Sequence, residues 1–318
     1  MKQRRILGFV LGAAVLAAVV VPATADAQDD AAPLAEAVTV QAVDPADLSG
    51  APTSSGGQVG TGETSPSSVV IPPAPGTPEP QIIIGNDGRT RETPTTQFPA
   101  SAVALIIVDP VNPAYGSFSC TGWFYSPDAV ATAAHCIEYD EQTAFYTVIP
   151  GRDGGSAPFP SCSNLDSVVS TNSWIDQNDG TERPPSGPAR DDYAILELNQ
   201  TLCDYGNDLG WFGFRQVADS KLEGKKETIN GYPADKPSGE QWKSEGKIKS
   251  FNKYLVRYKN DTFAGVSGSP VYRNFNNCGT CAIGIHTFGK ESQQFNAGTR
   301  IRPKVGKSLN RVDDNEGP

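Results

Sequence analysis

The chain has 318 residues and a formal net charge of −10, and 19% of its residues are charged. A short N-terminal segment (1–27, charge +2) and a proline-rich segment (28–81, charge −7) leave a charge of about −5 on residues 82–318. Nucleic-acid binding needs clustered positive charge, so a nucleic-acid partner is not expected.

The first 27 residues have the layout of a secretory signal peptide. Basic residues precede an uncharged apolar run at 6–21, and cleavage is expected after Ala25 or Ala27. The run is shorter than the about 20 residues of a membrane-spanning helix, which argues against the alternative of a membrane anchor. The sequence thus predicts a secreted, extracellular protein with no membrane association after processing.

Residues 28–81 differ in composition from the rest of the chain. They contain nine prolines and seven carboxylates, with no Lys, Arg, Cys or aromatic residue. Such a segment buries too little apolar surface to offset its conformational entropy. We expect a disordered acidic pro-segment or, alternatively, a linker, followed by a folded domain at 82–318.

The pattern of residues 82–318 is that of an all-β protein, either one large domain or two small barrels. Short runs rich in Val, Ile, Tyr and Phe alternate with Gly, Pro, Asn and Asp, which is typical of antiparallel strands. A short helix is expected only near the end. The strands are expected at Ala102–Val108, Phe145–Ile149, Tyr193–Leu198, Glu227–Gly231, Tyr254–Tyr258 and Cys281–Phe288, and the helix at Pro303–Val312.

Two motifs contain the residue types of nucleophilic catalysis. His135, one of two histidines in the chain, lies among small residues next to a cysteine, and Ser267 lies in a Gly-Val-Ser-Gly-Ser-Pro turn. A lone histidine is usually a packing or surface residue, and Ser269 is an alternative nucleophile in the same turn. The presence of both a base and a nucleophile favours a catalytic role for the two residues.

The segment Thr132–Cys136 resembles the histidine box of the trypsin/chymotrypsin superfamily, and Gly265–Pro270 resembles its serine loop. The resemblance implies two six-stranded antiparallel β-barrels. It also implies that His135 is the general base, that Ser267 is the nucleophile, and that the N–H groups of Gly265 and Ser267 form the oxyanion hole.

A carboxylate that orients the imidazole is expected just before the strand at Tyr193–Leu198. Asp192 fits the family's Asp-x-Ala/Thr-x-Leu strand, and Asp191 is the alternative, one residue out of register. The chain order His, Asp, Ser is the chymotrypsin-like order.

The six cysteines predict three disulfides, because an even count in a secreted chain favours pairing. The resemblance implies the pair Cys120–Cys136. The short spacing favours Cys278–Cys281 over a zinc motif, because no other ligands complete a tetrahedral set, and Cys162–Cys203 follows by elimination. No metal and no cofactor is expected.

A narrower resemblance, to the bacterial glutamyl endopeptidases, covers residues 82–312. It rests on the segments Ile82–Arg89, Gly231–Pro237 and Gly284–Gly289 and on the Ser-Gly-Ser-Pro form of the serine loop. It implies endoproteolytic cleavage of polypeptides after Glu or Asp by a monomeric enzyme. It also implies an α-amine freed by a cut near Ile82, so that an activating protease is an expected partner.

The same resemblance assigns the substrate-binding residues. The strand that contains His286 lines the specificity pocket, and its imidazole and the hydroxyl of Thr262 would donate hydrogen bonds to the substrate carboxylate. Thr287 and Gly289 are expected on the substrate-facing part of that strand.

Two residues depart from this pattern. Asp261 stands where trypsin-type enzymes keep the aspartate that binds Lys or Arg, so trypsin-like cleavage is an alternative. Val266 stands where zymogen-type relatives have Asp and glutamyl endopeptidases usually have Asn or Gln. An Asp there would bond a new N-terminus and Val cannot, which excludes that activation mechanism and suggests a weaker hold on the oxyanion loop. A non-catalytic binding protein on a protease fold is the second alternative, although such proteins usually lose a triad residue.

Overall fold

The computed structural model describes residues 81–110, 116–137, 144–171, 190–205 and 207–313. The expected signal peptide (1–27) and all of the expected pro-segment except its last residue, Gln81, lie outside these ranges. Within the described part, no helix is long and apolar enough to span a bilayer.

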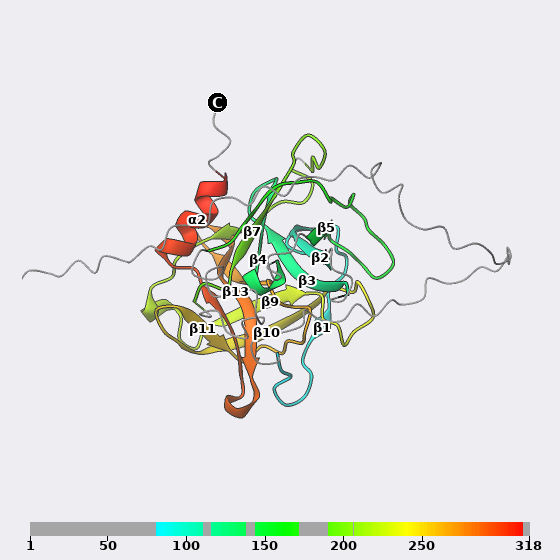
Figure 1. Ribbon diagram of the computed structural model, residues 1–318. Coiled ribbons are helices and arrows are strands. Elements are labelled where there is room, and N and C mark those ends of the chain that lie inside the picture. Colours follow the sequence, from blue (N-terminus) through cyan, green and yellow to red (C-terminus); the bar gives the residue numbers. More distant parts are fainter. Residues whose placement is uncertain (1–80, 111–115, 138–143, 172–189, 206, 314–318) are drawn as a thin grey trace, which may run out of the picture. The chain divides into compact units, whose positions relative to one another are not determined.

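The N-terminal half of the folded domain is one antiparallel sheet (cyan to green in Figure 1). Its strands follow the order β5-β2-β3-β4-β7-β6. They are β2 (Val103–Pro110), β3 (Phe118–Phe124), β4 (Ala129–Thr132), β5 (Ala144–Pro150), β6 (Leu165–Val169) and β7 (Ala194–Leu198), with short 3-10 turns at η2 (Ala100–Ala102) and η3 (Ala134–Cys136).

The C-terminal half is a closed six-stranded barrel (yellow to orange in Figure 1). The order runs β9-β10-β11-β14-β13-β12, and both β10 and β12 pair with β9 to close the ring. Its strands are β9 (Lys226–Gly231), β10 (Trp242–Phe251), β11 (Leu255–Tyr258), β12 (Pro270–Phe275), β13 (Gly279–Lys290) and β14 (Phe295–Arg300). Outside the ring are β1 (Thr90–Arg91) on β10, β8 (Gly213–Phe214) on β13, and the 3-10 turns η4 (Asp219–Lys221) and η5 (Glu291–Gln293).

The predicted all-β fold is confirmed, with one difference in the N-terminal half, which is a half-barrel. In the described residues β5 and β6 share no ladder; a single bridge joins Val148 of β5 to Cys162, three residues before β6. Pro158 and Pro160 precede that bridge. Proline lacks the N–H that a ladder needs, so the pairing does not continue from this bridge toward the prolines.

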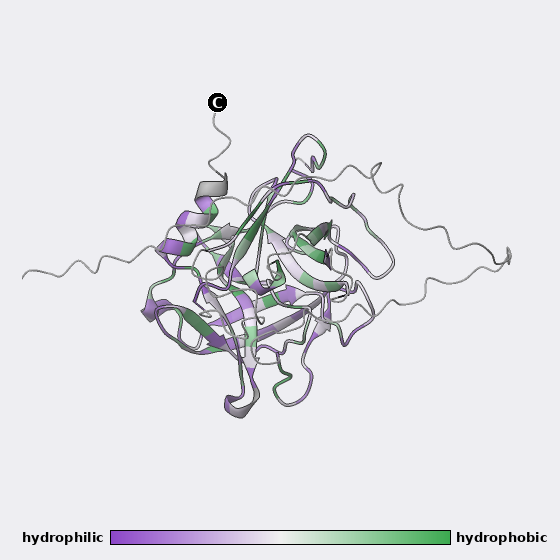
Figure 2. Cartoon of the chain, viewed as in Figure 1, coloured by the Kyte–Doolittle hydropathy of each residue, from purple (hydrophilic) through white to green (hydrophobic). Residues whose placement is uncertain are grey.

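Buried apolar side chains hold each half together, and in Figure 2 the hydrophobic colour follows the strands around β5 and β7. In the N-terminal sheet, Gly122 of β3 lets Val130 and Ile106 approach; a Cβ there would lie 2.6 and 2.7 Å from their methyl groups. One core cluster contains side chains of both halves, including Trp123 from β3 and Tyr272 from β12. Apolar packing therefore fixes the two halves against each other at the face where the site lies.

The predicted C-terminal helix is present as α2 (Pro303–Asp313) and packs against β4 and β7 (Figure 1). Proline suits the first position of a helix, where its missing N–H has no intrahelical partner. Val305 and Leu309, four residues apart, share one face and are fully buried. The helix thereby covers the N-terminal sheet with residues from the C-terminal end of the chain.

The six cysteines are bonded in the three expected pairs. These are Cys120–Cys136, Cys162–Cys203 and Cys278–Cys281, and no described cysteine is free. The first bond joins β3 to η3, next to His135.

Candidate active site

His135 lies on η3, the turn that follows β4. The chain enters this turn through buried alanines, and the disulfide of Cys136 to β3 fixes its far side. The imidazole is buried, with 6% of its surface exposed. Its position is therefore set by a strand before it and a covalent link after it.

Asp192 contacts His135 through both carboxylate oxygens. Oδ1 accepts from the His135 backbone N–H at 3.0 Å, and Oδ2 lies 2.8 Å from ring Nδ1. The β4–β7 ladder, with Thr132 opposite Ala194, brings the two residues together. A carboxylate on Nδ1 selects the tautomer whose Nε2 is a free acceptor.

Asp191, the alternative, faces away from the imidazole. Its carboxylate pairs with Arg302 at 3.0 Å, Lys304 at 3.4 Å and Arg190 at 3.1 Å. Lys304 lies in the first turn of α2 and Arg302 immediately precedes the helix, so Asp191 anchors the helix rather than the histidine.

Ser267 brings its hydroxyl to the other side of the imidazole. Its Oγ lies 2.8 Å from His135 Nε2, and its backbone carbonyl accepts from the N–H of Thr121 on β3 at 2.8 Å. The neighbouring Ser269 hydroxyl is buried with no hydrogen-bond partner among the described residues. Of the two serines, only Ser267 forms a hydrogen bond with His135 in the described structure.

Backbone contacts fix the orientation of the turn before Ser267. The Ala264 carbonyl accepts from Ala234 N–H at 2.7 Å, and Gly265 has φ +96°. The N–H and C=O of one peptide point in opposite directions, so the Gly265 N–H faces away from Ala234. Thr121 Oγ1 then donates to the Gly265 carbonyl at 2.8 Å. A Cβ at Gly265 would collide with the carbonyl of Tyr232, so this backbone requires glycine.

Val266 anchors the same turn by packing rather than by charge. Its side chain is 3% exposed and belongs to the barrel's apolar cluster with Leu222 and Ile229. Its N–H donates to the Phe263 carbonyl at 3.1 Å. Several contacts therefore hold this loop despite the absence of an acidic residue at 266.

The segment that enters the domain at residue 81 reaches the same place, which the sequence did not reveal. The Gln81 carboxamide lies 2.6 Å from Ser267 Oγ. Ile82 is held by the side-chain amide of Asn296, which accepts from its N–H at 3.0 Å and donates to its carbonyl at 2.7 Å. Thr262 N–H donates to the same carbonyl at 3.2 Å. Neither Gln81 nor Asn296 belongs to a motif that would have singled it out.

Asp261 does not offer its carboxylate to a substrate. Oδ1 accepts from Ile84 N–H at 2.7 Å and Oδ2 accepts from Gly88 N–H at 2.8 Å. Both oxygens are thus engaged by the backbone of the entering segment, and neither forms a hydrogen bond with His286.

His286 is fully buried in β13, beside the serine turn. Its backbone pairs with that turn, since its carbonyl accepts from Gly268 N–H at 2.8 Å. Ring Nδ1 lies 2.6 Å from the hydroxyl of Tyr258 on β11. Burial lowers the pKa of His286 to about 3. The charge of the neighbouring His135 lowers this pKa further, and a hydrogen bond with the backbone of Ala297 raises it in part. The imidazole is neutral at neutral pH.

The other expected substrate-binding residues lie near this strand. The hydroxyls of Thr262 and Thr287 are buried without a hydrogen-bond partner in the described structure. Thr287 stands at the bulge between His286 and Phe288, where the β13–β14 register shifts. Gly289 pairs with Asn296. Two buried hydroxyls in this region therefore lack a hydrogen-bond partner in the described structure.

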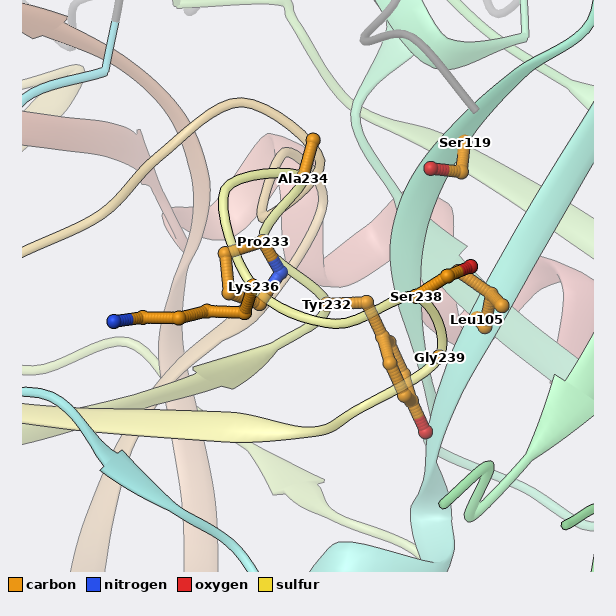
Figure 3. Close-up of a pocket in the computed structure, with 8 residues that line it drawn as sticks. All are labelled: Leu105, Ser119, Tyr232, Pro233, Ala234, Lys236, Ser238 and Gly239. Atoms are coloured by element: carbon orange, nitrogen blue, oxygen red, sulfur yellow. The ribbon is translucent and has the colours of Figure 1, made fainter. Parts of the chain in front are cut away.

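A further pocket lies beside the loop that follows β9 (Figure 3). It is bounded by β2, β3 and the loop after β9, and Figure 3 shows the Lys236 side chain directed away from Ser119. Lys236 instead pairs with Asp87 at 2.9 Å and stacks on Trp242. Its lining residues are Leu105, Ser119, Tyr232, Pro233, Ala234, Lys236, Ser238 and Gly239, and of these Ala234 donates its backbone N–H to the Ala264 carbonyl of the turn before Ser267.

Residues 89–305 match the family model described as Trypsin. The chain belongs to the trypsin family. Among its relatives, the glutamyl endopeptidase of Bacillus licheniformis is 39% identical over 236 residues, which cover 71% of this chain and 67% of the relative. A protein of Bacillus subtilis named extracellular metalloprotease is 34% identical and covers 73% of this chain and 69% of its own.

The fold of this trypsin-family chain matches a solved Glu endopeptidase in complex with MPD. The TM-score is 0.61 at 24% identity, covering 73% of this chain and all of the other. The family model and the curated relatives identify the protein as a serine endopeptidase.

Proposed function

We propose that this serine endopeptidase cleaves polypeptides after Glu, and after Asp, with Ser267 as nucleophile, His135 as general base and Asp192 as its orienting carboxylate. The observation that carries the proposal is the continuous hydrogen-bonded chain from Asp192 Oδ2 through both ring nitrogens of His135 to Ser267 Oγ, with contacts of 2.8 Å on each side.

The first half of the reaction forms an acyl-enzyme. Ser267 Oγ attacks the scissile carbonyl carbon while its proton moves to His135 Nε2. Asp192 stabilises the imidazolium, and the N–H groups of Gly265 and Ser267 bind the oxyanion. His135 then returns the proton to the leaving amine, the C–N bond breaks and the C-terminal product departs.

The second half hydrolyses the acyl-enzyme. A water molecule gives a proton to His135 Nε2 and attacks the ester carbon, and the same backbone donors bind the second oxyanion. Return of the proton to Ser267 Oγ releases the new carboxylic acid and restores the enzyme.

The preference for an acidic side chain rests on the groups near the turn. His286 is neutral and can donate through one ring nitrogen, and the Thr262 and Thr287 hydroxyls have no partner in the described residues. Hydrogen bonds to a carboxylate are about twice as strong as neutral ones. The engagement of both Asp261 oxygens by backbone N–H groups argues against binding of Lys or Arg.

The chain is further proposed to be secreted and processed. A signal peptide at residues 1–27 would be removed, and a later cut near Ile82 would separate the acidic segment from the domain. The mature enzyme would act as a monomer on polypeptides, and the processing protease is its expected partner.

A peptide library and an active-site label test the proposal together. The processed protein is expected to cut after Glu and Asp and to react with a fluorophosphonate, and Ser267→Ala is expected to abolish both, with Ser269→Ala as matched control. Cuts after Lys or Arg would contradict the specificity, and absence of labelling in processed wild type would favour a non-catalytic binding protein.

A further inference from the structure

Tyr258 and His286 meet across an intervening strand. In the barrel, β14 lies between β11 and β13, and its Gly298 stands opposite His286. A Cβ at position 298 would lie 3.0 Å from the Tyr258 hydroxyl. Glycine at this position leaves the space through which the phenol reaches the imidazole.

The hydrogen bond between them has a defined direction. Tyr258 OH lies 2.6 Å from His286 Nδ1, and both side chains are fully buried. Burial raises the pKa of Tyr258 well above its usual value, so the phenol keeps its proton. If the imidazole donated to the phenol oxygen, the proton of the Tyr258 hydroxyl would have no acceptor among the described residues, which is costly in a buried site. Tyr258 therefore donates, and the neutral imidazole holds its proton on Nε2.

We propose that Tyr258 is a positioning residue for substrate specificity, which fixes the His286 tautomer that can donate to the substrate's carboxylate. This rests on the proposed role of His286. An imidazole protonated on Nδ1 would present the lone pair of Nε2 to the carboxylate, and two acceptors repel each other. The phenol thus acts on selectivity through His286 and does not touch the reacting atoms.

The Tyr258→Phe variant tests this with matched peptides that differ only in Glu or Gln before the cut. The ratio of their kcat/KM values is expected to fall about tenfold, the equivalent of one hydrogen bond. Fluorophosphonate labelling is expected to stay within about twofold of wild type, since a neutral tautomer has no part in Ser267 activation. Tyr205→Phe is the control, because its buried hydroxyl donates to the Pro160 carbonyl at 2.9 Å in the other half.

The chain has two histidines, so ¹⁵N NMR of the imidazoles reads the tautomer directly, with His286→Gln for assignment. Wild type is expected to show the Nε2–H form of His286, and Tyr258→Phe a mixture. An Nδ1–H form in wild type, or equal losses with both peptides, would overturn the proposal. A wild type without preference for Glu over Gln contradicts the proposed specificity instead, and the tautomer measurement remains valid.

A second inference follows independently from Gln81. The hydrogen-bonding groups around Gln81 fix which end of its carboxamide is the oxygen. In that orientation the carboxamide oxygen accepts from Ser267 Oγ at 2.6 Å and from Ser267 N–H at 3.3 Å, and the carboxamide nitrogen donates to the Phe263 carbonyl. The Ser267 N–H is one of the two proposed oxyanion donors. Gln81 is 6% exposed and Ser267 is 1% exposed, so the side chain covers the nucleophile.

This carboxamide also interferes with activation of the hydroxyl. A serine hydroxyl has one proton, and in this orientation the Gln81 oxygen competes with His135 Nε2 for it. The bonds of Asn296 to both sides of the Ile82 backbone hold the next residue, so the carboxamide is not free to drift away.

We infer that Gln81 is an intramolecular plug: in the uncut chain its carboxamide occupies the place of the scissile carbonyl, and a cut near Ile82 releases it. Peptide and glutamine carbonyl oxygens accept the same hydrogen bonds, so the side chain imitates a substrate but carries no bond in position to be cleaved. One residue, Gln81, would thereby let the uncut acidic segment inhibit the active site.

The test uses the full chain carrying Gln81→Ala and, as a more conservative change, Gln81→Asn, whose amide is one methylene shorter. The measured quantity is the second-order rate of fluorophosphonate labelling of the uncut form, identified by intact mass. The Ala variant is expected to label at least about tenfold faster than wild type, as loss of a competing hydrogen bond predicts, and the exposed Gln216→Ala to match wild type.

Equal labelling rates of uncut wild type and both Gln81 variants would overturn the plug, provided that the processed form labels. If the processed form does not label, the proposed catalytic function is what fails. The two failures are therefore distinguishable in one experiment.

Discussion

Asp192 binds two different nitrogens of His135, the backbone N–H with Oδ1 and ring Nδ1 with Oδ2. The first bond fixes the turn and the second fixes the ring, so one carboxylate controls both position and tautomer. The carboxylate of the adjacent Asp191 forms ion pairs with Arg302 and Lys304. Two neighbouring aspartates thus have separate tasks.

This division predicts opposite effects of two neighbouring substitutions. Asp192→Asn is expected to lower kcat by about 10⁴, as in other triads in which the wrong tautomer forms. Asp191→Asn is expected to leave kcat within a few-fold but to lower the free energy of unfolding by about 3 kcal/mol, because the buried Arg302 loses its partner. Peptide hydrolysis and urea denaturation of both variants check this, and equal kcat losses would contradict it.

Gly265→Ala is expected to lower kcat by at least 10² to 10³, the cost of about one oxyanion donor. At φ +96° a side chain strains the backbone, and relief of its collision with Tyr232 would rotate the N–H out of the site. Gly224, with φ +67° and open space around it, is the matched control. Gly224→Ala is expected to cost about 1 kcal/mol of stability and no activity, measured by denaturation and kcat.

Asp261→Asn is expected to retain the preference for acidic residues. Because the carboxylate accepts from the N–H groups of Ile84 and Gly88, its loss should lower stability by about 1–3 kcal/mol without changing the ratio of kcat/KM values for Glu and Lys peptides. A shift of that ratio would show that Asp261 faces the substrate after all.

The buried His286 makes stability depend on pH. Its folded-state pKa of about 3 lies below the value of about 6.5 for an unfolded chain, so between these values the unfolded state binds more protons. Its contribution is fully present above pH 6.5 and is lost as the pH falls toward 3, at up to about 1.4 kcal/mol per pH unit.

Denaturant unfolding of wild type and His286→Gln between pH 4 and pH 7 isolates this contribution. The stability of wild type relative to the variant is expected to shrink as the pH falls. A difference that stays constant across the range would mean that His286 is not held neutral by burial.

The sequence predicted those parts of the site that lie in short contiguous motifs. His135 and Ser267 are each surrounded by the small residues and glycines that their turns need, and the structure places their side chains in contact. The fold class followed from the alternation of apolar runs and turn residues. Asp192 was separable from Asp191 only by register with the strand, a weaker signal.

The rest depends on contacts between distant segments. Gln81 and Ser267 are 186 residues apart, and Tyr258 and His286 meet only because Gly298 lies between their strands. The open N-terminal sheet was also not predicted, since the family pattern implies a closed barrel and the single bridge between Val148 and Cys162 joins distant segments. The hydrogen bonds of the Asp261 carboxylate were likewise not predictable, because its partners are backbone N–H groups, which carry no sequence signature.

The proposed nucleophile and its proposed base belong to different halves of the fold. Ser267 stands before β12 of the barrel, whereas His135 on η3 and Asp192 before β7 belong to the N-terminal half. A partly folded chain with one half formed has a hydroxyl without a base, or a base without a hydroxyl. On the proposed mechanism, hydrolysis begins only after the halves dock, so a partly folded molecule has no protease activity of its own.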